Sequence, residues 1–150
     1  MDLQLTGATA LVLGGHGLIG SAVVRRLREE GVIAVPASRM STQGFVIDAT
    51  DDASVAAGLE RFIGEHGCLD ILIHSAAPSA RTLDPARNAD PEQVLAASDA
   101  KAMSFLRVAN AVLPAMVAAS HGRVVGVSGQ NAFITGNITG SVRNAALVIA

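Results

Sequence analysis

The chain has 150 residues, of which 50% are hydrophobic, and a formal net charge of −2 at pH 7. This length fits one domain, and without a basic stripe we expect no nucleic-acid partner. No apolar run approaches the roughly 18 residues that a membrane span needs, so we expect no membrane contact. Cys68 is the only cysteine, which excludes an intrachain disulfide. Together with an N-terminus unlike a signal peptide, this favours a cytoplasmic protein.

Short apolar runs alternate along the chain with segments of helical periodicity. The predicted elements are strands at 8–13, 32–35, 45–47, 69–73 and 123–127, and helices at 19–30, from 50 or 51 to 67, and from 91 to about 120. Pro36 should close the second strand, and Pro114 should kink the last helix or mark a tighter final stretch. Residues 129–141 are expected to form a polar loop before a new apolar segment, 145–150.

This alternation predicts an α/β fold, a Rossmann-type doubly wound parallel sheet in three α/β/α layers with right-handed crossovers. We expect residues 1–150 to form a single domain. Only nine residues, 36–44, separate the second and third strands, which leaves little room for a crossover helix. A sheet of this kind normally continues beyond Ala150, whereas we expect this sequence to stop inside the helix that follows the fifth strand. We therefore expect the C-terminal part of the fold to be missing or truncated.

A glycine turn joins the first strand to the first helix. Gly14, Gly17 and Gly20 have the spacing G-x-x-G-x-x-G between an apolar run and an amphipathic segment. The first glycine allows a sharp turn, the second lets the backbone approach a pyrophosphate, and the third lets the helix pack close to the strand. Free N–H groups at the helix N-terminus then suit a phosphate. The sequence predicts nucleotide binding, and a bare tight turn is the alternative.

The chain resembles the short-chain dehydrogenase/reductase family along nearly its whole length. The blocks that carry the resemblance are the glycine loop 11–20, in the spacing of the family's extended and atypical branches, the D-x-T-D block 48–51, the strand 69–77 (L-D-I-L-I-H-S-A-A), the helix end 112–116 and the fifth strand 122–128. The resemblance implies a Rossmann sheet, an NAD(P) cofactor and a homodimer or homotetramer built on the last two long helices.

The resemblance and the glycine turn together define the expected cofactor contacts. These are Gly14, His16, Gly17, Leu18, Ile19, Gly20, Ser38, Arg39, Asp48, Ala49, Ser75, Ala76 and Ala77. In the family, the position of Asp48 holds the adenine. His16 either touches phosphate or is merely tolerated at the turn.

The end of the second strand bears on the choice of cofactor. A carboxylate there would hold the ribose 2′-OH of NAD, but the sequence has Ser38 and Arg39. Both can hydrogen-bond to a 2′-phosphate, and Arg39 can neutralise it. We therefore expect NADP(H) in preference to NAD(H), and the alternative is that Arg39 is a plain surface residue.

The resemblance implies a catalytic set of Ser, Tyr, Lys and a helix Asn, but the chain contains no Tyr. Matching 145–147 to the family's A-A-L block puts Gly140 at the Tyr position and Asn144 at the Lys position. Lys101 falls at the helix Asn position. We hypothesise a reciprocal swap that keeps an ammonium and an amide in the cleft, where a Lys with a depressed pKa can transfer protons. The alternative is a solvated Lys101.

Further polar residues lie near the expected site. Ser128 is the candidate for the catalytic serine, although Gly129 occupies the usual position. His74 ends the fourth strand, as a site residue or, more simply, as a hydrogen-bonded structural imidazole. Arg81 and Arg87 either meet an anionic substrate or are solvated loop charges. No pair of His or carboxylate residues has metal-ligand spacing, so we expect no metal.

Two functions remain open from the sequence. One is an NAD(P)(H)-dependent oxidoreductase of short-chain dehydrogenase/reductase type, acting on a small carbonyl/alcohol pair with non-standard proton-transfer residues. The other is a catalytically silent NADP(H)-binding sensor or oligomeric scaffold, which the missing Tyr favours. An incomplete chain would explain a missing substrate lobe, but not Gly140 and Asn144.

Overall fold

A computed structural model describes residues 3–78, 83–134 and 136–149. Five parallel strands form one sheet in the order β3-β2-β1-β4-β5. Their bounds are β1 Thr9–Leu13, β2 Ile33–Ser38, β3 Phe45–Val46, β4 Ile71–His74 and β5 Arg123–Gly126. The chain reverses its direction of travel across the sheet between β1 and β4, which is the switch point of a doubly wound fold. The predicted fold class is confirmed.

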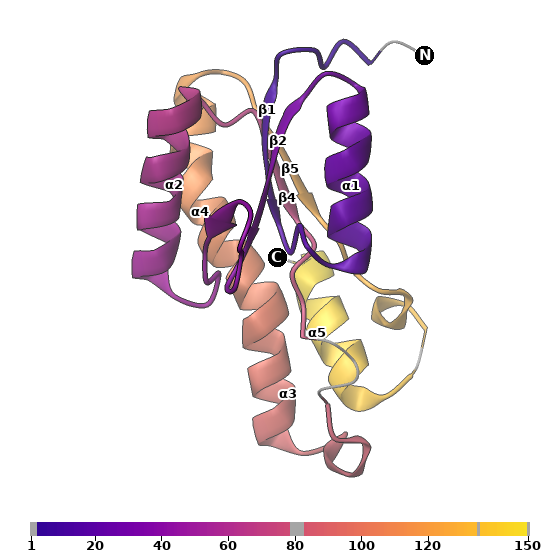
Figure 1. Cartoon of the computed structure of the whole chain (residues 1–150). Coiled ribbons are helices and arrows are strands. Elements are labelled where there is room, and N and C mark those ends of the chain that lie inside the picture. The colour runs from indigo at the N-terminus through magenta and orange to yellow at the C-terminus, as the bar shows by residue number, and fades with distance from the viewer. Residues whose placement is uncertain (1–2, 79–82, 135, 150) are drawn as a thin grey trace.

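Helices cover both faces of the sheet (Figure 1). Helix α1 (Leu18–Glu29) lies on one face, and α2 (Asp52–His66) and α4 (Ser104–Ala118) lie on the other. Local sequence determines the ends of α2. The Asp51 carboxylate accepts a hydrogen bond from the Ser54 N–H at 2.7 Å, and Gly67 ends the helix with a φ of 82°.

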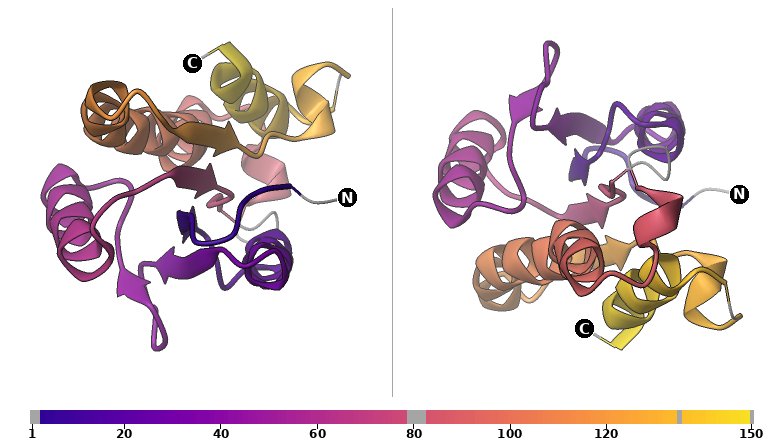
Figure 2. Two further views of the ribbon diagram at one scale, coloured as in Figure 1. Left: turned by 90° about the horizontal axis from the view of Figure 1, so that it is seen from above. Right: turned by 90° about the horizontal axis from the view of Figure 1, so that it is seen from below.

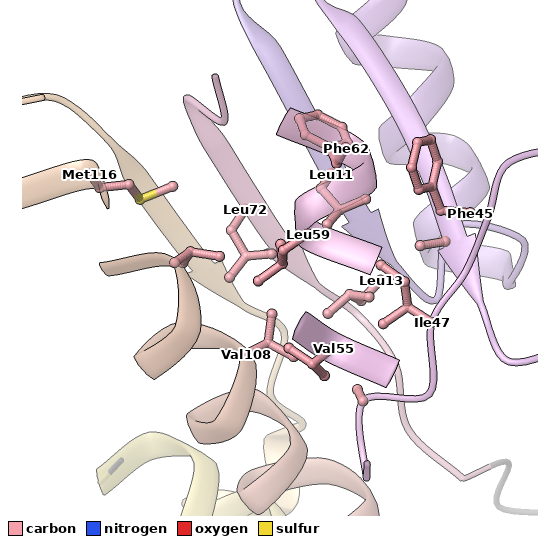
Figure 3. Close-up of a cluster of buried hydrophobic side chains, with 13 residues drawn as sticks. Leu11, Leu13, Phe45, Ile47, Val55, Leu59, Phe62, Leu72, Val108 and Met116 are labelled. Atoms are coloured by element: carbon pink, nitrogen blue, oxygen red, sulfur yellow. The ribbon is translucent and has the colours of Figure 1, made fainter. Parts of the chain in front are cut away.

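Two hydrophobic clusters hold the layers together, and β1 contributes to both by alternation. Leu11 and Leu13 point to the cluster shared with α2 and α4, which Figure 3 shows with Leu59 and Phe62 of α2 and Val108 and Met116 of α4. Ala10 and Val12 point to the cluster under α1. Full burial of a large apolar side chain contributes roughly 1.5–3 kcal/mol, so this two-sided core fixes β1 at the centre of the sheet.

The sequence predicts one helix from 91 to about 120, but the structure divides it. Helix α3 (Pro91–Ser98) passes into a π-helical segment, η3 (Asp99–Met103), before α4 begins. The irregularity therefore falls at 99–103, whereas α4 continues through Pro114 to Ala118. Pro114 has no N–H to donate to the carbonyl of Asn110, four residues earlier in the helix. Both residues are exposed, so water can solvate that carbonyl.

The boundary predicted at Pro36 is also wrong, because β2 runs through it to Ser38. β3 pairs with β2 only from Ala37 onward, so no ladder bond on that side needs an N–H from Pro36. The link from β2 to β3 contains no helix, as its length predicts.

Helix α5 (Ile138–Ile149) begins inside the predicted polar loop 129–141, so that prediction is wrong in its second half. A short 3-10 turn, η4 (Gln130–Ala132), occupies part of the first half, and another, η2 (Pro85–Arg87), precedes α3. Helix α5 packs against α3, η3 and η4, and Figures 1 and 2 show it beside α3 beyond the lower end of the strands. Tertiary packing therefore overrides the weak helix propensity of the Ile-Thr-Gly-Ser start.

Candidate functional site

The glycine turn closes tightly over the carboxyl end of β1. Gly14 has a φ of 76°, and a Cβ there would lie 2.7 Å from the backbone nitrogen of Ala76. A Cβ on Gly20 would overlap the carbonyl oxygen of Gly14. Only glycine fits either position, because the first needs a left-handed backbone and both need close approach. The backbone of β1, the segment after β4 and the first turn of α1 are thereby drawn together.

The N-terminus of α1 offers its N–H groups outward. Gly17 is the N-cap and carries no side chain to cap the helix, and the first turn holds no acidic residue. Leu18 and Ile19 that follow are exposed. An anion here meets the positive end of the helix dipole and a surface without a Cβ. The residues of this turn fit the pyrophosphate of a dinucleotide.

Polar side chains continue the site along the ends of β2 and β3. The Asp48 carboxylate accepts hydrogen bonds from the Thr50 hydroxyl at 2.7 Å and the Thr50 N–H at 3.0 Å. These bonds lower the pKa of Asp48, with smaller contributions from the charges of Arg39 and Arg107. Asp48 is therefore ionised and fixed in orientation, and the exposed Arg39 stands beside it.

The segment after β4 completes the opposite wall. The Ser75 hydroxyl donates to the Leu13 carbonyl at 2.8 Å, which ties the end of β4 to the end of β1. This bond occupies the Ser75 hydroxyl. The surface of this wall therefore consists of backbone and the methyl groups of Ala76 and Ala77. On the other side of the turn, His16 shares a 2.8 Å hydrogen bond with the Ser41 hydroxyl.

One cavity of about 630 Å³ follows this edge of the sheet. Its lining includes ten of the expected cofactor residues: Gly14, His16, Gly17, Ser38, Arg39, Asp48, Ala49, Ser75, Ala76 and Ala77. The other three expected residues are not part of this lining: Leu18 and Ile19 are exposed, and Gly20 is buried. A larger hollow of about 790 Å³ lies between α1, β2 and the β2–β3 link; it shares His16 with the first cavity, but its lining includes no residue of β4 or of the segment after it. The cavity at the switch point is the candidate site, because ligands of open α/β sheets bind there.

The cavity ends at η3 and the start of α4, where Ala100 and Ser104 contribute to its wall. Lys101 lies between them and is only 7% exposed, so its interpretation as a solvated helix residue is wrong. Burial lowers the pKa of Lys101, and the charge of Arg143 lowers it further. π-helical turns often occur at functional sites, and here the turn places a lysine in the interior.

His74 is fully buried at the end of β4. Its Nε2 shares a 3.0 Å hydrogen bond with the Ser104 hydroxyl, and the ring of Phe105 contacts it edge-on. Burial lowers the pKa of His74 to about 4, with a further contribution from the charge of Lys101. His74 is therefore neutral at pH 7, as expected of a hydrogen-bonded structural imidazole.

Ser128 and Asn144 lie together at the end of β5. The Ser128 hydroxyl donates to the Asn144 carbonyl at 3.0 Å, and Asn144 is 6% exposed. A Cβ on Gly129 would come within 2.7 Å of the Asn144 side-chain nitrogen, so that amide fills the space beside Gly129. Lys101 belongs to the same region because η3 packs against α5.

Sequence reasoning missed two residues of α5, Ser141 and Arg143. In the described part of the chain, the buried side-chain atoms without a hydrogen-bond partner are His74 Nδ1, Ser141 Oγ, Arg143 Nε and Asn144 Oδ1. All four belong to β4 or α5. The only signal for Arg143 was its position next to Asn144, and the predicted loop concealed the helix that buries it.

The remaining candidates have simpler roles. Arg87 is exposed and pairs with Asp90 and Glu92, so it is a loop charge within its own segment. Arg81 lies outside the described residues. Among residues 3–78, 83–134 and 136–149, no cluster of three or more His, Cys, Asp or Glu residues has the arrangement of a metal site. No helix within those residues is long and apolar enough to cross a membrane.

The family model described as enoyl-(acyl carrier protein) reductase matches residues 7–146. The chain belongs to the short-chain dehydrogenase/reductase family. The members of this family are NAD(P)-dependent oxidoreductases. The predicted family and the general type of cofactor are confirmed.

Individual relatives agree with this membership. The chain is 30% identical to the hydroxy(phenyl)methylsuccinyl-CoA dehydrogenase subunit BbsC of Thauera aromatica, over 85% of this chain and 57% of that protein. It is 26% identical to 3-oxoacyl-(acyl-carrier-protein) reductase FabG of Escherichia coli, over 95% of this chain and 59% of that protein. The chain therefore spans a little under three fifths of the length of these relatives.

Solved structures show the same fold at lower sequence identity. A short chain dehydrogenase from Bacillus anthracis superposes with a TM-score of 0.85 at 15% identity, over 95% of this chain and 64% of that one. The crystal structure of gox2181 superposes with a TM-score of 0.84 at 21% identity, over 95% of this chain and 63% of that one.

Proposed function

We propose that this chain binds NADP(H) and is part of an oxidoreductase that interconverts a carbonyl and an alcohol. The observation that carries the proposal is the cavity at the switch point, which joins the glycine turn to Asp48 and to the segment after β4. The nicotinamide supplies or accepts the hydride, and the protein provides orientation and proton transfer. The backbone of Gly14–Gly20 would hold the pyrophosphate, and Asp48 the adenine.

The preference for NADP(H) rests on the end of β2. Ser38 and Arg39 line the cavity where a carboxylate would suit NAD, and the only carboxylate in this lining, Asp48, is bonded to Thr50. A guanidinium there favours a 2′-phosphate. Fluorescence titration of the purified chain with NADPH and with NADH tests this preference. Tighter binding of NADH would reject it.

Lys101, Ser128 and Asn144 are the proposed site residues at the reacting end. Of their side chains, the Ser128 hydroxyl is already bonded, whereas no hydrogen bond or ion pair with described residues engages the Lys101 ammonium. We therefore assign Lys101 to hold the substrate by hydrogen bonding from its ammonium. Turnover of Lys101→Met, followed by NADPH absorbance in a screen of carbonyl compounds, tests this role. Activity equal to that of the unmodified chain would exclude it.

A catalytically silent NADP(H)-binding protein is the second candidate. Two observations favour it: the chain has no Tyr, and Gly140 and Asn144 occupy the positions matched to the Tyr-x-x-x-Lys pair of the family. The same titration and screen separate the two functions. NADPH binding without turnover of any carbonyl compound supports the silent protein.

We further propose a homodimer or homotetramer. Support comes from exposed apolar side chains on α3, η3, α4 and α5, namely Leu95, Met103, Leu113, Val117, Val142, Val148 and Ile149. Light scattering coupled to size-exclusion chromatography measures the mass directly, and a monomer at micromolar concentration would reject the proposal.

A further inference from the structure

Two cationic side chains from different elements lie behind the reacting end of the cavity, near enough for the charge of Arg143 to lower the pKa of Lys101. Lys101 comes from η3, and Arg143 comes from α5, which packs against η3. Arg143 reaches the segment after β4, where its Nη1 donates to the Pro78 carbonyl at 3.2 Å. Pro78 itself lines the cavity, so the guanidinium is hydrogen-bonded to a residue of the cavity wall.

Neither cation has an acidic partner in the described part of the chain. The carboxylate closest in sequence to Lys101 is Asp99, and it turns instead to Arg107 at 3.8 Å. Arg107 also pairs with Asp52 at 2.7 Å. The imidazole of His74 is neutral at pH 7, so it supplies no negative charge to either cation. The reacting end therefore holds buried positive charge without compensation.

Uncompensated buried charge is costly, and a cation can avoid the cost by losing its proton or by binding an anion. Deprotonation relieves Lys101 alone, because an arginine stays charged at any pH the protein experiences. It also leaves the buried Nε of Arg143 without an acceptor. An anion relieves both groups, since it accepts from the ammonium and from the guanidinium together.

We propose that Lys101 and Arg143 form a subsite for an anionic group on the substrate, either a carboxylate or a phosphate. This inference rests on the proposed function, because it names the substrate class of the same site. The subsite lies at the far end of the cavity from Arg39, so it is separate from the expected position of the cofactor's 2′-phosphate. The reacting carbonyl and the anionic group then belong to one small molecule.

Calorimetric titration of the chain, with and without NADPH, tests the subsite. The probes are pyruvate, its uncharged analogue methyl pyruvate, and inorganic phosphate. The variants are Lys101→Met and Arg143→Leu, with Lys101→Arg to retain the charge. Arg25→Gln is the matched control, because it removes one positive charge from the exposed face of α1.

We expect pyruvate to bind at least tenfold more tightly than methyl pyruvate, with at least a tenfold loss in Lys101→Met and in Arg143→Leu. Lys101→Arg and Arg25→Gln should retain the affinity. Phosphate binding that the same two variants abolish, without pyruvate binding, supports the subsite and identifies a phosphate group as its ligand.

Equal binding of pyruvate and methyl pyruvate, equal affinity in the variants, or no binding of either anion overturns the inference. If the variants fail to fold, as circular dichroism would show, the comparison of acid and ester on the unmodified chain still decides. A chain that binds no NADPH contradicts the proposed function, whereas NADPH binding without anion binding contradicts the subsite alone.

Discussion

The two ends of the cavity differ in how far the chain satisfies its own polar groups. At the end lined by the glycine turn (the glycine end), three polar side chains have partners within the chain: Asp48 bonds to Thr50, Ser75 to Leu13, and His16 to Ser41. At the reacting end, four buried polar atoms of β4 and α5 have none among the described residues. The glycine end is thus shaped by close backbone approach, and the reacting end by unsatisfied side chains. The backbone of the glycine turn and the charge of Arg39 therefore suit the proposed cofactor, whereas the unsatisfied groups at the other end suit a ligand held by charge and hydrogen bonding.

We expect the largest effect from a substitution in the glycine turn. Gly20→Ala places a Cβ against the Gly14 carbonyl, which only a backbone shift can relieve. We expect a loss of about 3 kcal/mol in the free energy of unfolding and at least tenfold weaker NADPH binding. Urea denaturation and fluorescence titration measure the two. Gly64→Ala is the control, because a Cβ meets nothing there and should stabilise α2 by about 0.5–1 kcal/mol.

Acid should destabilise the folded chain through His74 at the reacting end. The pKa of His74 is about 4 in the folded chain against 6.5 for the free side chain, so the unfolded chain binds more protons between these values. Stability contributed by neutral His74 is present above pH 6.5 and is lost as the pH falls toward 4. The full loss is about 3 kcal/mol.

In His74→Asn this part of the pH dependence should disappear. Urea denaturation of both proteins at intervals from pH 4 to pH 7.5 gives the difference, and carboxylates that titrate in both cancel in it. Parallel stability curves for the two proteins would show that His74 is not buried as the neutral base.

Substitutions of the two cations Arg39 and Lys101 should affect cofactor binding differently. Arg39→Ala should weaken NADPH binding about tenfold, or about 1.4 kcal/mol, and leave NADH binding unchanged. Lys101→Met should change neither, because the two residues serve opposite ends of the cavity. The affinities come from the same fluorescence titration. Equal losses for NADPH and NADH in Arg39→Ala would show that Arg39 does not read the 2′-phosphate.

The smallest expected effect concerns Asp48. Thr50→Val removes the hydroxyl that bonds to the carboxylate, so the pKa of Asp48 should rise toward its ordinary value. The stability contributed by this low pKa is present above the unfolded pKa and lost in acid, and for this accessible group it is at most about 1 kcal/mol. Carbon NMR of the carboxyl group follows the titration. An unchanged pKa would show that the remaining Thr50 N–H bond suffices.

The parallel sheet, the glycine turn and most of the residues that line the cavity could be predicted from the sequence. Each of these depends on local chemistry: apolar runs that form strands, an Asp51 cap, and glycines where a Cβ has no room. Strands, caps and turns depend on near neighbours in the sequence, so residue spacing predicts them, whereas Asp48 and the segment after β4 were predicted from the resemblance to the family.

The arrangement of residues at the reacting end could not be predicted from the sequence, because it depends on tertiary packing. The π-helical turn at 99–103 buries Lys101, although its sequence reads as ordinary helix. The α5 start at Ile138 has weak helix propensity and forms because α3, η3 and η4 pack on it, which brings in Arg143. Burial and the absence of acidic partners among the described residues are properties of the packed chain. They change the pKa of Lys101 and the hydrogen-bonding needs of Arg143 through desolvation, which no local pattern of residues records.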